Sequence, residues 1–372
     1  MKSIRPQIVC IARPTARLIR ASPATITAKR GSTFATKTYR LFHQAPSRIE
    51  ILSRRASNSL PTAPSRQAAY STATAPTNEP TIHDVFEPKT STWQYIVADP
   101  FTSTAVIIDP VLDYDPVTQA ITTESADALL SLVKEKGYDI SHILETHAHA
   151  DHLTAASYLQ SRLAEEQGHK PSIGIGKRIG QVQKLFGEKY GVPRQEYERV
   201  VDKLFDDDET FEIGQLKATA MHLPGHTPDH LGYKIGDNVF CGDSLFHADI
   251  GTARCDFPGG SANNLFNSGR RLLSLPDNVK IWTGHDYPPS ERGTPASWMS
   301  VEEHRKQNRH LKDGVTEEEF VAMRQERDAT LAAPRLLDQS LQINIRGGRL
   351  PRPSESGLRM LHLPLKVKSA QW

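Results

Sequence analysis

The chain has 372 residues, of which 24% are charged and 38% hydrophobic, a composition that allows a substantial buried core. It contains no run of about 20 apolar residues, so we expect no membrane insertion. Thirteen of its 45 Lys and Arg residues but only one of its 43 Asp and Glu residues lie in the first 77 positions. Residues 78–372 therefore hold 32 basic and 42 acidic residues, a net charge of −10 that argues against a nucleic-acid partner.

Residues 1–77 are rich in Arg, Ser, Thr and Ala, which is typical of a mitochondrial transit peptide followed by a disordered linker. The alternative is a basic tail that binds nucleic acid. The basic residues are spread singly rather than clustered, which favours the transit peptide. We therefore expect cleavage between Arg40 and Ser71 and localisation in the mitochondrial matrix.

Ordered structure is expected to begin near Thr81, where "TIHDVFE", "TWQYIVADP" and "TAVIIDPV" each have the pattern of a strand. A helix is predicted over 124–136, ended by Gly137. The short apolar run "ISHILET" predicts a buried strand, a helix is expected over 153–166, and "PSIGIG" predicts another strand. "GIGKRIG" departs from the dinucleotide-loop spacing, so we interpret it as a strand leading into a helix near Arg178.

The second half repeats the alternation of strands and helices. "LKATAMHLPG", "LGYKIGD" and "NVFCGDSLF" predict strands, followed by a helix over 261–275 and the strand "NVKIWTGHD". We therefore expect an α/β domain over 78–290, with sheets buried between helical layers. Residues 291–372 are expected to pack on it as an extension, with helices over 300–311 and 317–331 and a late strand, "LQINIR".

A dense group of metal-binding side chains follows the strand "ISHILET". His147, His149, Asp151 and His152 form the pattern H-x-H-x-D-H, and packing them without a metal would carry a large desolvation cost. Imidazole and carboxylate groups suit Zn, Fe or Mn. Later strand ends supply further candidates, in "LPGHTPDH", "FCGDSLF" and "WTGHDY": His226, Asp243 and His285.

Taken in order, these motifs resemble those of the metallo-β-lactamase superfamily, whose fold is an αβ/βα four-layer sandwich. Within it, "THAHADHLTAA" and "GDSLFHADIGTARCDFPGG" are more similar to the persulfide dioxygenases, also called sulfur dioxygenases or ethylmalonic encephalopathy proteins. The tail also resembles that of a longer bacterial branch of these proteins. The resemblance implies one Fe(II) per chain and oxidation of glutathione persulfide by O2 to sulfite and glutathione. It places the iron ligands on His147, His226 and Asp243.

The same resemblance assigns roles to the other residues. His149, Asp151, His152 and His285 would support the ligands or hold a second metal, while His230 has no ligand counterpart. Arg254 matches an arginine of the family's substrate region, although an ion pair with Asp256 is the alternative. Tyr287 is a further candidate for substrate contact.

Ligand identity alone leaves a second activity open. All seven ligand positions of the binuclear hydrolases are occupied, so two Zn ions could support thioester hydrolysis of the hydroxyacylglutathione hydrolase type. Three cysteines are too few for a disulfide framework, and we expect Cys241 and Cys255 to be buried hydrophobic residues. The sequence leaves a homodimer open.

Overall fold

The structure is a computed structural model that describes residues 79–368; the predicted transit peptide and linker, and Cys10, lie outside the described residues. One six-stranded sheet has the order β1-β2-β3-β6-β8-β9. Its strands are β1 (Thr81–Glu87), β2 (Thr92–Ala98), β3 (Thr104–Ile108), β6 (Asp139–Leu144), β8 (Ser172–Gly176) and β9 (Lys203–Phe205). Strands β3, β6, β8 and β9 run parallel to one another, so their carboxyl ends lie at the same edge of the sheet.

A second six-stranded sheet follows the order of the chain, from β10 to β15. Its strands are β10 (Glu209–Ile213), β11 (Leu216–His222), β12 (Leu231–Ile235), β13 (Asn238–Phe240), β14 (Lys280–Trp282) and β15 (Trp298–Ser300). A small third sheet has the order β5-β4-β7 and consists of β4 (Val111–Asp115), β5 (Ala120–Thr122) and β7 (Leu153–Thr154).

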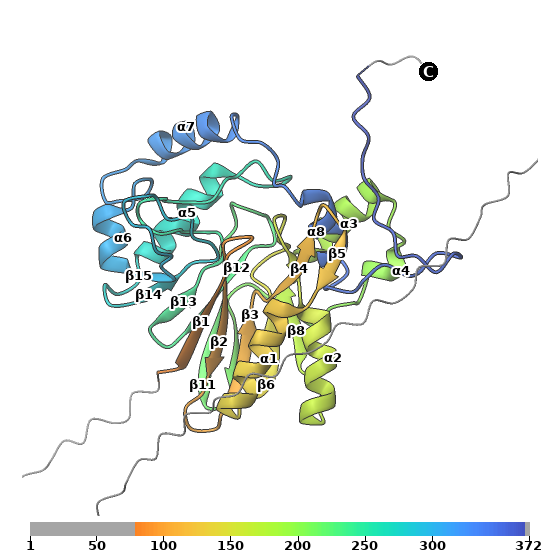
Figure 1. Ribbon diagram of the computed structural model, residues 1–372. Helices are drawn as coiled ribbons and strands as arrows, with labels where there is room; N and C mark the ends of the chain where they lie inside the picture. Colours follow the sequence, from red (N-terminus) through yellow and green to blue (C-terminus); the bar gives the residue numbers. More distant parts are fainter. Residues whose placement is uncertain (1–78, 369–372) are drawn as a thin grey trace, which may run out of the picture. The chain divides into compact units, whose positions relative to one another are not determined.

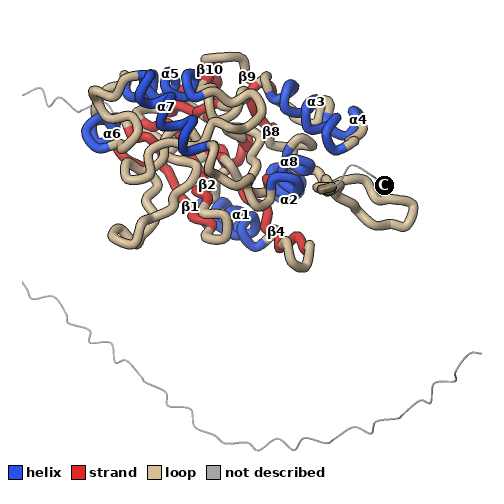
Figure 2. Tube along the Cα trace, turned by 90° about the horizontal axis from the view of Figure 1, so that it is seen from above, coloured by secondary structure: helices blue, strands red, loops and turns tan. Residues whose placement is uncertain are grey.

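Helices cover the outer faces of the two large sheets (Figure 1). On the first sheet these are α1 (Glu124–Lys136) and α2 (Ala156–Gln167), and on the second α5 (Ala262–Leu273), α6 (Val301–Gln307) and α7 (Glu317–Asp328). Three more helices complete the fold: α3 (Ile179–Tyr190), α4 (Arg194–Tyr197) and α8 (Leu337–Asn344). Figure 2, from above, shows strands between helices on either side.

Alternating side chains of each central strand explain the layers. In β3, Ala105 and Ile107 pack toward α1 and α2, whereas Val106 and Ile108 pack between the two sheets. The core between the sheets also contains Tyr233 of β12, and a third core joins the second sheet to α5 and α7. This arrangement confirms the predicted αβ/βα four-layer sandwich, since a strand buried on both faces needs a cover on each.

Two sequence predictions of local structure were wrong. Residues 153–154 form strand β7, paired with β4, and helix α2 begins only at Ala156. The late strand predicted for "LQINIR" is largely helix α8. Its residues alternate between apolar and polar, as in a strand with one buried face, but Gln342 and Asn344 are buried as well. Their amides are satisfied by hydrogen bonds, so the alternation does not separate core from solvent.

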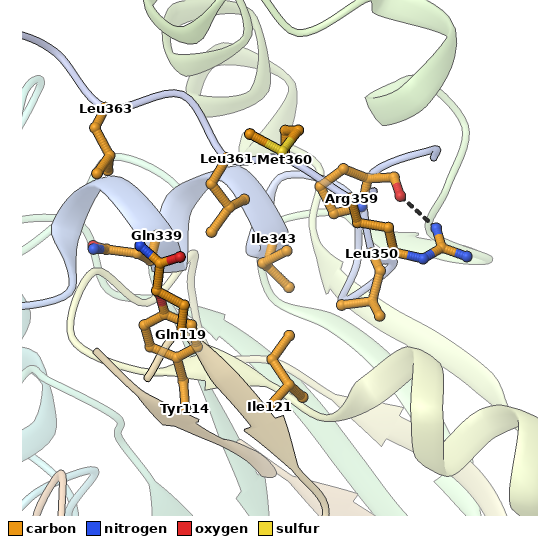
Figure 3. Close-up of a pocket in the computed structure, with 11 residues that line it drawn as sticks. Tyr114, Gln119, Ile121, Gln339, Ile343, Leu350, Arg359, Met360, Leu361 and Leu363 are labelled. Carbon is orange, nitrogen blue, oxygen red and sulfur yellow. Dashed lines mark hydrogen bonds between the residues drawn. The ribbon is translucent and has the colours of Figure 1, made fainter. Parts of the chain in front are cut away.

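The C-terminal extension packs on the domain through α7, α8 and part of the segment after α8. Helix α7 packs against α5, and α8 packs against β7 and α3. The tail then turns back over α8 and the β4–β5 hairpin, where Leu350 and Leu361 border an apolar pocket of about 300 Å³ (Figure 3). In that view Arg359 donates a hydrogen bond to the carbonyl oxygen of Pro351. Among the described residues, no helix is long and apolar enough to cross a membrane.

Candidate metal centre

The predicted metal-binding residues come from four loops that each follow a strand. The H-x-H-x-D-H loop follows β6, His226 lies between β11 and β12, Asp243 follows β13, and His285 follows β14. Loops at strand ends position side chains from distant parts of the chain around one point. A bridge between Thr92 of β2 and His285 ties the two sheets together beside this point.

Three of these residues form a compact group that we call the triad: His147, His226 and Asp243. Their ligand atoms lie within 4.8 Å of one another, and all three side chains are buried. The Nε2 atom of His226 lies 3.5 Å from the Oδ2 atom of Asp243. Two imidazoles and one carboxylate form the ligand set that non-haem Fe(II) sites use.

The other four form a second group, the tetrad, which consists of His149, Asp151, His152 and His285. The Nε2 atom of His285 lies 3.1 Å from the Oδ2 atom of Asp151 and 3.5 Å from the Oδ1 atom of Asp243. Asp243 therefore directs one carboxylate oxygen toward each group. The structure brings together all seven residues that the sequence selected.

Hydrogen bonds behind the triad fix which imidazole nitrogen faces inward. The Thr146 hydroxyl donates to Asp109, so Nδ1–H of His147 donates to that hydroxyl, at 2.9 Å, and Nε2 is left with a lone pair. Likewise, Nδ1–H of His226 donates to the carbonyl oxygen of Arg254 at 2.7 Å. Such outer partners orient metal-binding histidines and raise their basicity.

The tetrad is held differently, by carboxylates. The Nε2 atom of His149 lies 3.1 Å from Asp109 and 3.2 Å from Glu145, so its Nδ1 atom is the one that faces His152 and His285. His285 uses its Nδ1–H toward the carbonyl oxygen of Ser91, at 3.2 Å. Its Nε2 atom therefore remains available to the centre.

The residues present fit a bound metal. Six of their nitrogen and oxygen atoms are buried without a hydrogen-bond partner, which is costly unless a cation compensates. They are His147 Nε2, His149 Nδ1, Asp151 Oδ2, His152 Nε2, Asp243 Oδ1 and His285 Nε2. A Cβ atom on Gly284 would lie 2.6 Å from Asp243 Oδ1, so the glycine allows this close approach.

The electrostatics of the site favour the metal-binding protonation states of His147, His152 and Asp151. Burial lowers the pKa of His147 well below its usual value and that of His152 to about 3. Burial raises the pKa of Asp151, but the charges of His285, His152 and His149 together outweigh it and lower this pKa to about 2. Neutral imidazole and ionised carboxylate are the forms that bind cations. Burial also lowers the pKa of His149, yet Asp109 and Glu145 outweigh it and raise it well above normal.

The C-terminal extension supports both groups through separate helices. In α7, Asp328 accepts a hydrogen bond from the backbone N–H of Cys255 at 2.8 Å and pairs with Arg324, which is fully buried. This fixes the loop whose Arg254 carbonyl orients His226. In α8, Asn344 donates to the carbonyl oxygens of His149 and His152, at 2.7 and 2.9 Å.

The other predicted residues are placed as follows. Arg254 donates twice to Asp256, at 2.5 Å, and once to the carbonyl oxygen of Ala332, so the ion pair considered from the sequence is present. Tyr287 is half exposed, and its ring stacks on His285. His230 accepts from the backbone N–H of Asp243 at 3.0 Å, a supporting role.

The cysteine prediction is confirmed. Cys241 and Cys255 are free and buried. Burial raises the pKa of both thiols to about 12, which disfavours the nucleophilic thiolate.

Sequence reasoning missed Asp109, Thr146 and Asn344, which form hydrogen bonds to the histidines of the triad and the tetrad or to their backbone. Asp109 carried a usable signal, because it directly follows the strand "TAVII", where functional side chains commonly gather. Strand β3 pairs in parallel with β6, so a residue after β3 must lie near the loop after β6. Asn344 had no such signal, because its partners are about 190 residues away in sequence.

Comparison with known proteins agrees with this geometry. Residues 88–285 match the model of the metallo-beta-lactamase superfamily. The chain is 44% identical over 281 residues to glyoxylase B2 of Dictyostelium discoideum, covering 74% of this chain and 94% of the relative. It is 30% identical over 266 residues to the mitochondrial persulfide dioxygenase ETHE1 of Bos taurus, covering 71% and 87% of the two chains.

A solved structure gives the same result. The crystal structure of ETHE1 from Myxococcus xanthus aligns with a TM-score of 0.57 and 28% sequence identity, over 72% of this chain and all of the other. The range matched by the superfamily model, residues 88–285, includes each of the four loops that carry the triad and the tetrad. The chain therefore belongs to the metallo-β-lactamase superfamily of metal-dependent enzymes, and its similarities include the ETHE1 persulfide dioxygenases.

Proposed function

We propose that the protein is a persulfide dioxygenase that binds one Fe(II) through His147, His226 and Asp243. The observation that carries the proposal is the triad itself, a buried group of two imidazoles and one carboxylate with its ligand atoms within 4.8 Å. A facial set of three protein ligands leaves about three positions open, enough for a persulfide sulfur and O2 together. Similarity to the ETHE1 proteins of Bos taurus and Myxococcus xanthus supports the same activity.

The overall reaction would convert glutathione persulfide, O2 and water into glutathione, sulfite and two protons. When bound, the iron would supply redox chemistry and a template that brings the two reactants together. The protein's own contribution is orientation. Thr146 and the Arg254 carbonyl hold the two histidine rings of the triad, and His230 holds the Asp243 backbone.

The tetrad would support this reaction without holding iron. Asp151 and His285 already form a close pair, and His149 is flanked by Asp109 and Glu145. These charges compensate one another within the protein. His285 and Asp151 would therefore be available to hold or move protons beside the substrate.

A second candidate is a binuclear zinc thioester hydrolase. It is favoured by Asp243, whose two oxygens each lie 3.5 Å from a histidine of a different group, as expected of a bridging ligand. The 44% identity to a protein named glyoxylase B2 points the same way.

Metal content and oxygen uptake, measured on one purified sample, distinguish the two candidates. We expect about one Fe per chain and oxygen consumption when glutathione persulfide is added. Two Zn per chain, with hydrolysis of S-lactoylglutathione and no oxygen uptake, would establish the hydrolase instead.

We further propose that residues 1–77 direct the protein to the mitochondrial matrix, on the composition of that segment. A fusion of these residues to a fluorescent reporter is expected to enter mitochondria. A fusion with its Arg and Lys residues replaced by Gln provides the control. A reporter that stays outside in both cases would contradict the proposal.

A further inference from the structure

The apolar pocket under the C-terminal tail lies between α8, the β4–β5 hairpin and residues 350–363 (Figure 3). Its volume of about 300 Å³ is at the lower end of the range for small-molecule sites. Seven of the eleven residues that line it are Ile, Leu, Met or Pro. None of the eleven belongs to the triad or the tetrad, so the pocket is separate from the metal centre.

Specific contacts hold the tail over this pocket. The side-chain amide of Gln342 in α8 donates to the carbonyl oxygen of His362 at 2.8 Å and accepts from its backbone N–H at 2.9 Å. The Nδ1–H group of His362 donates to the carbonyl oxygen of Tyr190 at 2.6 Å. Leu361 and Leu363, on either side of His362, are thereby fixed as one wall of the pocket.

The rim of the pocket carries apolar side chains that the protein leaves in contact with solvent. Met360 is 56% exposed and Leu363 52% exposed, and both line the pocket. Large apolar side chains exposed side by side usually mark a surface that binds something. A ligand with an apolar chain would remove part of this surface from water.

Arg359 is the only charged residue of the lining. Its guanidinium donates one hydrogen bond, to the carbonyl oxygen of Pro351, and forms no ion pair with any described residue. A guanidinium has five N–H donors, so most of them remain available to an anion. The other polar residues of the lining, Tyr114, Gln119 and Gln339, carry no charge. The complement of this pocket is therefore a single negative charge attached to an apolar chain.

We propose that the pocket binds a medium-chain carboxylate, with its chain against the apolar wall and its carboxylate on Arg359. At about 30 Å³ for each group the size of a water molecule or a methylene, the pocket holds roughly ten such groups. A chain of about eight to ten carbons therefore fits. The inference does not depend on the proposed function, because no residue of the metal centre takes part.

The pocket shares α8 with the metal centre, which gives the ligand a route of influence. Ile343 lines the pocket, and the next residue, Asn344, donates to the carbonyl oxygens of His149 and His152. Asn344 also accepts from the backbone N–H of Thr154 at 2.9 Å. A ligand packed on Ile343 would stabilise α8 and these hydrogen bonds, because binding to the folded state opposes opening.

Calorimetric titration of the metal-loaded full chain with decanoate tests the site. We expect one decanoate per chain, with an affinity that rises about fourfold for each methylene from hexanoate to decanoate. Decylamine should bind at least tenfold more weakly, because its charge is repelled by Arg359. Arg359→Gln should weaken decanoate binding about tenfold and leave decanol binding unchanged. The matched control is Arg352→Gln, an exposed cation of the same tail outside the lining, which should bind decanoate like the parent.

Amide hydrogen exchange tests the connection to the metal loop. Saturating decanoate should slow exchange of the Thr154 amide at least tenfold, and unchanged exchange there would refute the connection. Equal affinities for decanoate and decylamine, or equal losses in the two arginine variants, would overturn the proposed site. So would a chain that fails to bind decanoate and sediments as a dimer dissociated by Leu363→Ser, since a second copy would then cover the tail.

Discussion

The triad and the tetrad are neighbours built from the same residue types, yet they are held in opposite ways. The two histidines of the triad donate to neutral acceptors, the Thr146 hydroxyl and the Arg254 carbonyl. The tetrad contains a 3.1 Å pair between His285 and Asp151, and His149 contacts two further carboxylates. The tetrad therefore compensates its own charges, whereas Asp243 has no partner closer than 3.5 Å among the charged groups around it.

Groups built from the same residue types can therefore differ in how strongly a bound metal stabilises them. Asp243 is a buried carboxylate without a close cation, which is costly unless an ion binds, whereas the His285–Asp151 pair already offsets part of that cost within the tetrad. Each group is also supported by its own helix of the C-terminal extension. Substitutions can therefore address the two groups separately.

The largest effect is expected from removing a ligand of the triad. Asp243→Ala should abolish iron binding and lower kcat/KM about 1000-fold or more, because the metal's contribution is lost. His152→Ala, the tetrad control, should retain about one iron per chain and lose only about 10- to 100-fold in activity. Elemental analysis with oxygen uptake measures both. Equal loss of metal in the two variants would mean that the groups act as one binuclear site.

The next largest effect concerns the helix behind the triad. Asp328→Ala leaves Arg324 buried without its ion-pair partner, and we expect a loss of about 3–5 kcal/mol in the free energy of unfolding. Denaturant unfolding measures it. Asp256→Ala, which breaks the exposed pair of the same loop, should cost less than about 1 kcal/mol. If both variants are equally stable, the α7 contact does not anchor this loop.

A smaller effect is expected behind the tetrad. Asn344→Ala removes two hydrogen bonds to carbonyl oxygens of the H-x-H-x-D-H loop and one from the backbone N–H of Thr154 in β7. We expect a loss of about 1–3 kcal/mol in the free energy of unfolding, with iron retained. The exposed Asn263→Ala serves as the control. Loss of iron from the Asn344 variant would show that the two groups are not separately supported.

The smallest effect is expected from removing one hydrogen bond behind the triad, between Thr146 and His147. Thr146→Val removes the hydroxyl that orients His147, so iron affinity should fall about tenfold, while Thr146→Ser should restore it. Competition with a chelator measures the affinity. A Ser variant as weak as the Val variant would assign the role to the methyl group of Thr146.

Much of the fold and of the metal centre followed from the sequence. Apolar strands alternating with helical segments predicted the layered sandwich, and His147, His226 and Asp243 were each identifiable at the end of a strand. These features are local: hydrophobic period and the residues that follow a strand are properties of short segments. Cys241 and Cys255 could be assigned to the core because free cysteines are commonly buried.

Only the tertiary structure decided what surrounds these residues. "LQINIR" alternates like a strand, but burial on every side makes it a helix that anchors the metal loop through Asn344. Asp328 reaches the loop that orients His226 from a segment 73 residues away in sequence. The role of such a residue depends on the groups that surround it and on how much water reaches it, and no local sequence pattern encodes either. The sequence by itself identified the candidate ligands, and the packing of distant segments decided how each of these side chains is held.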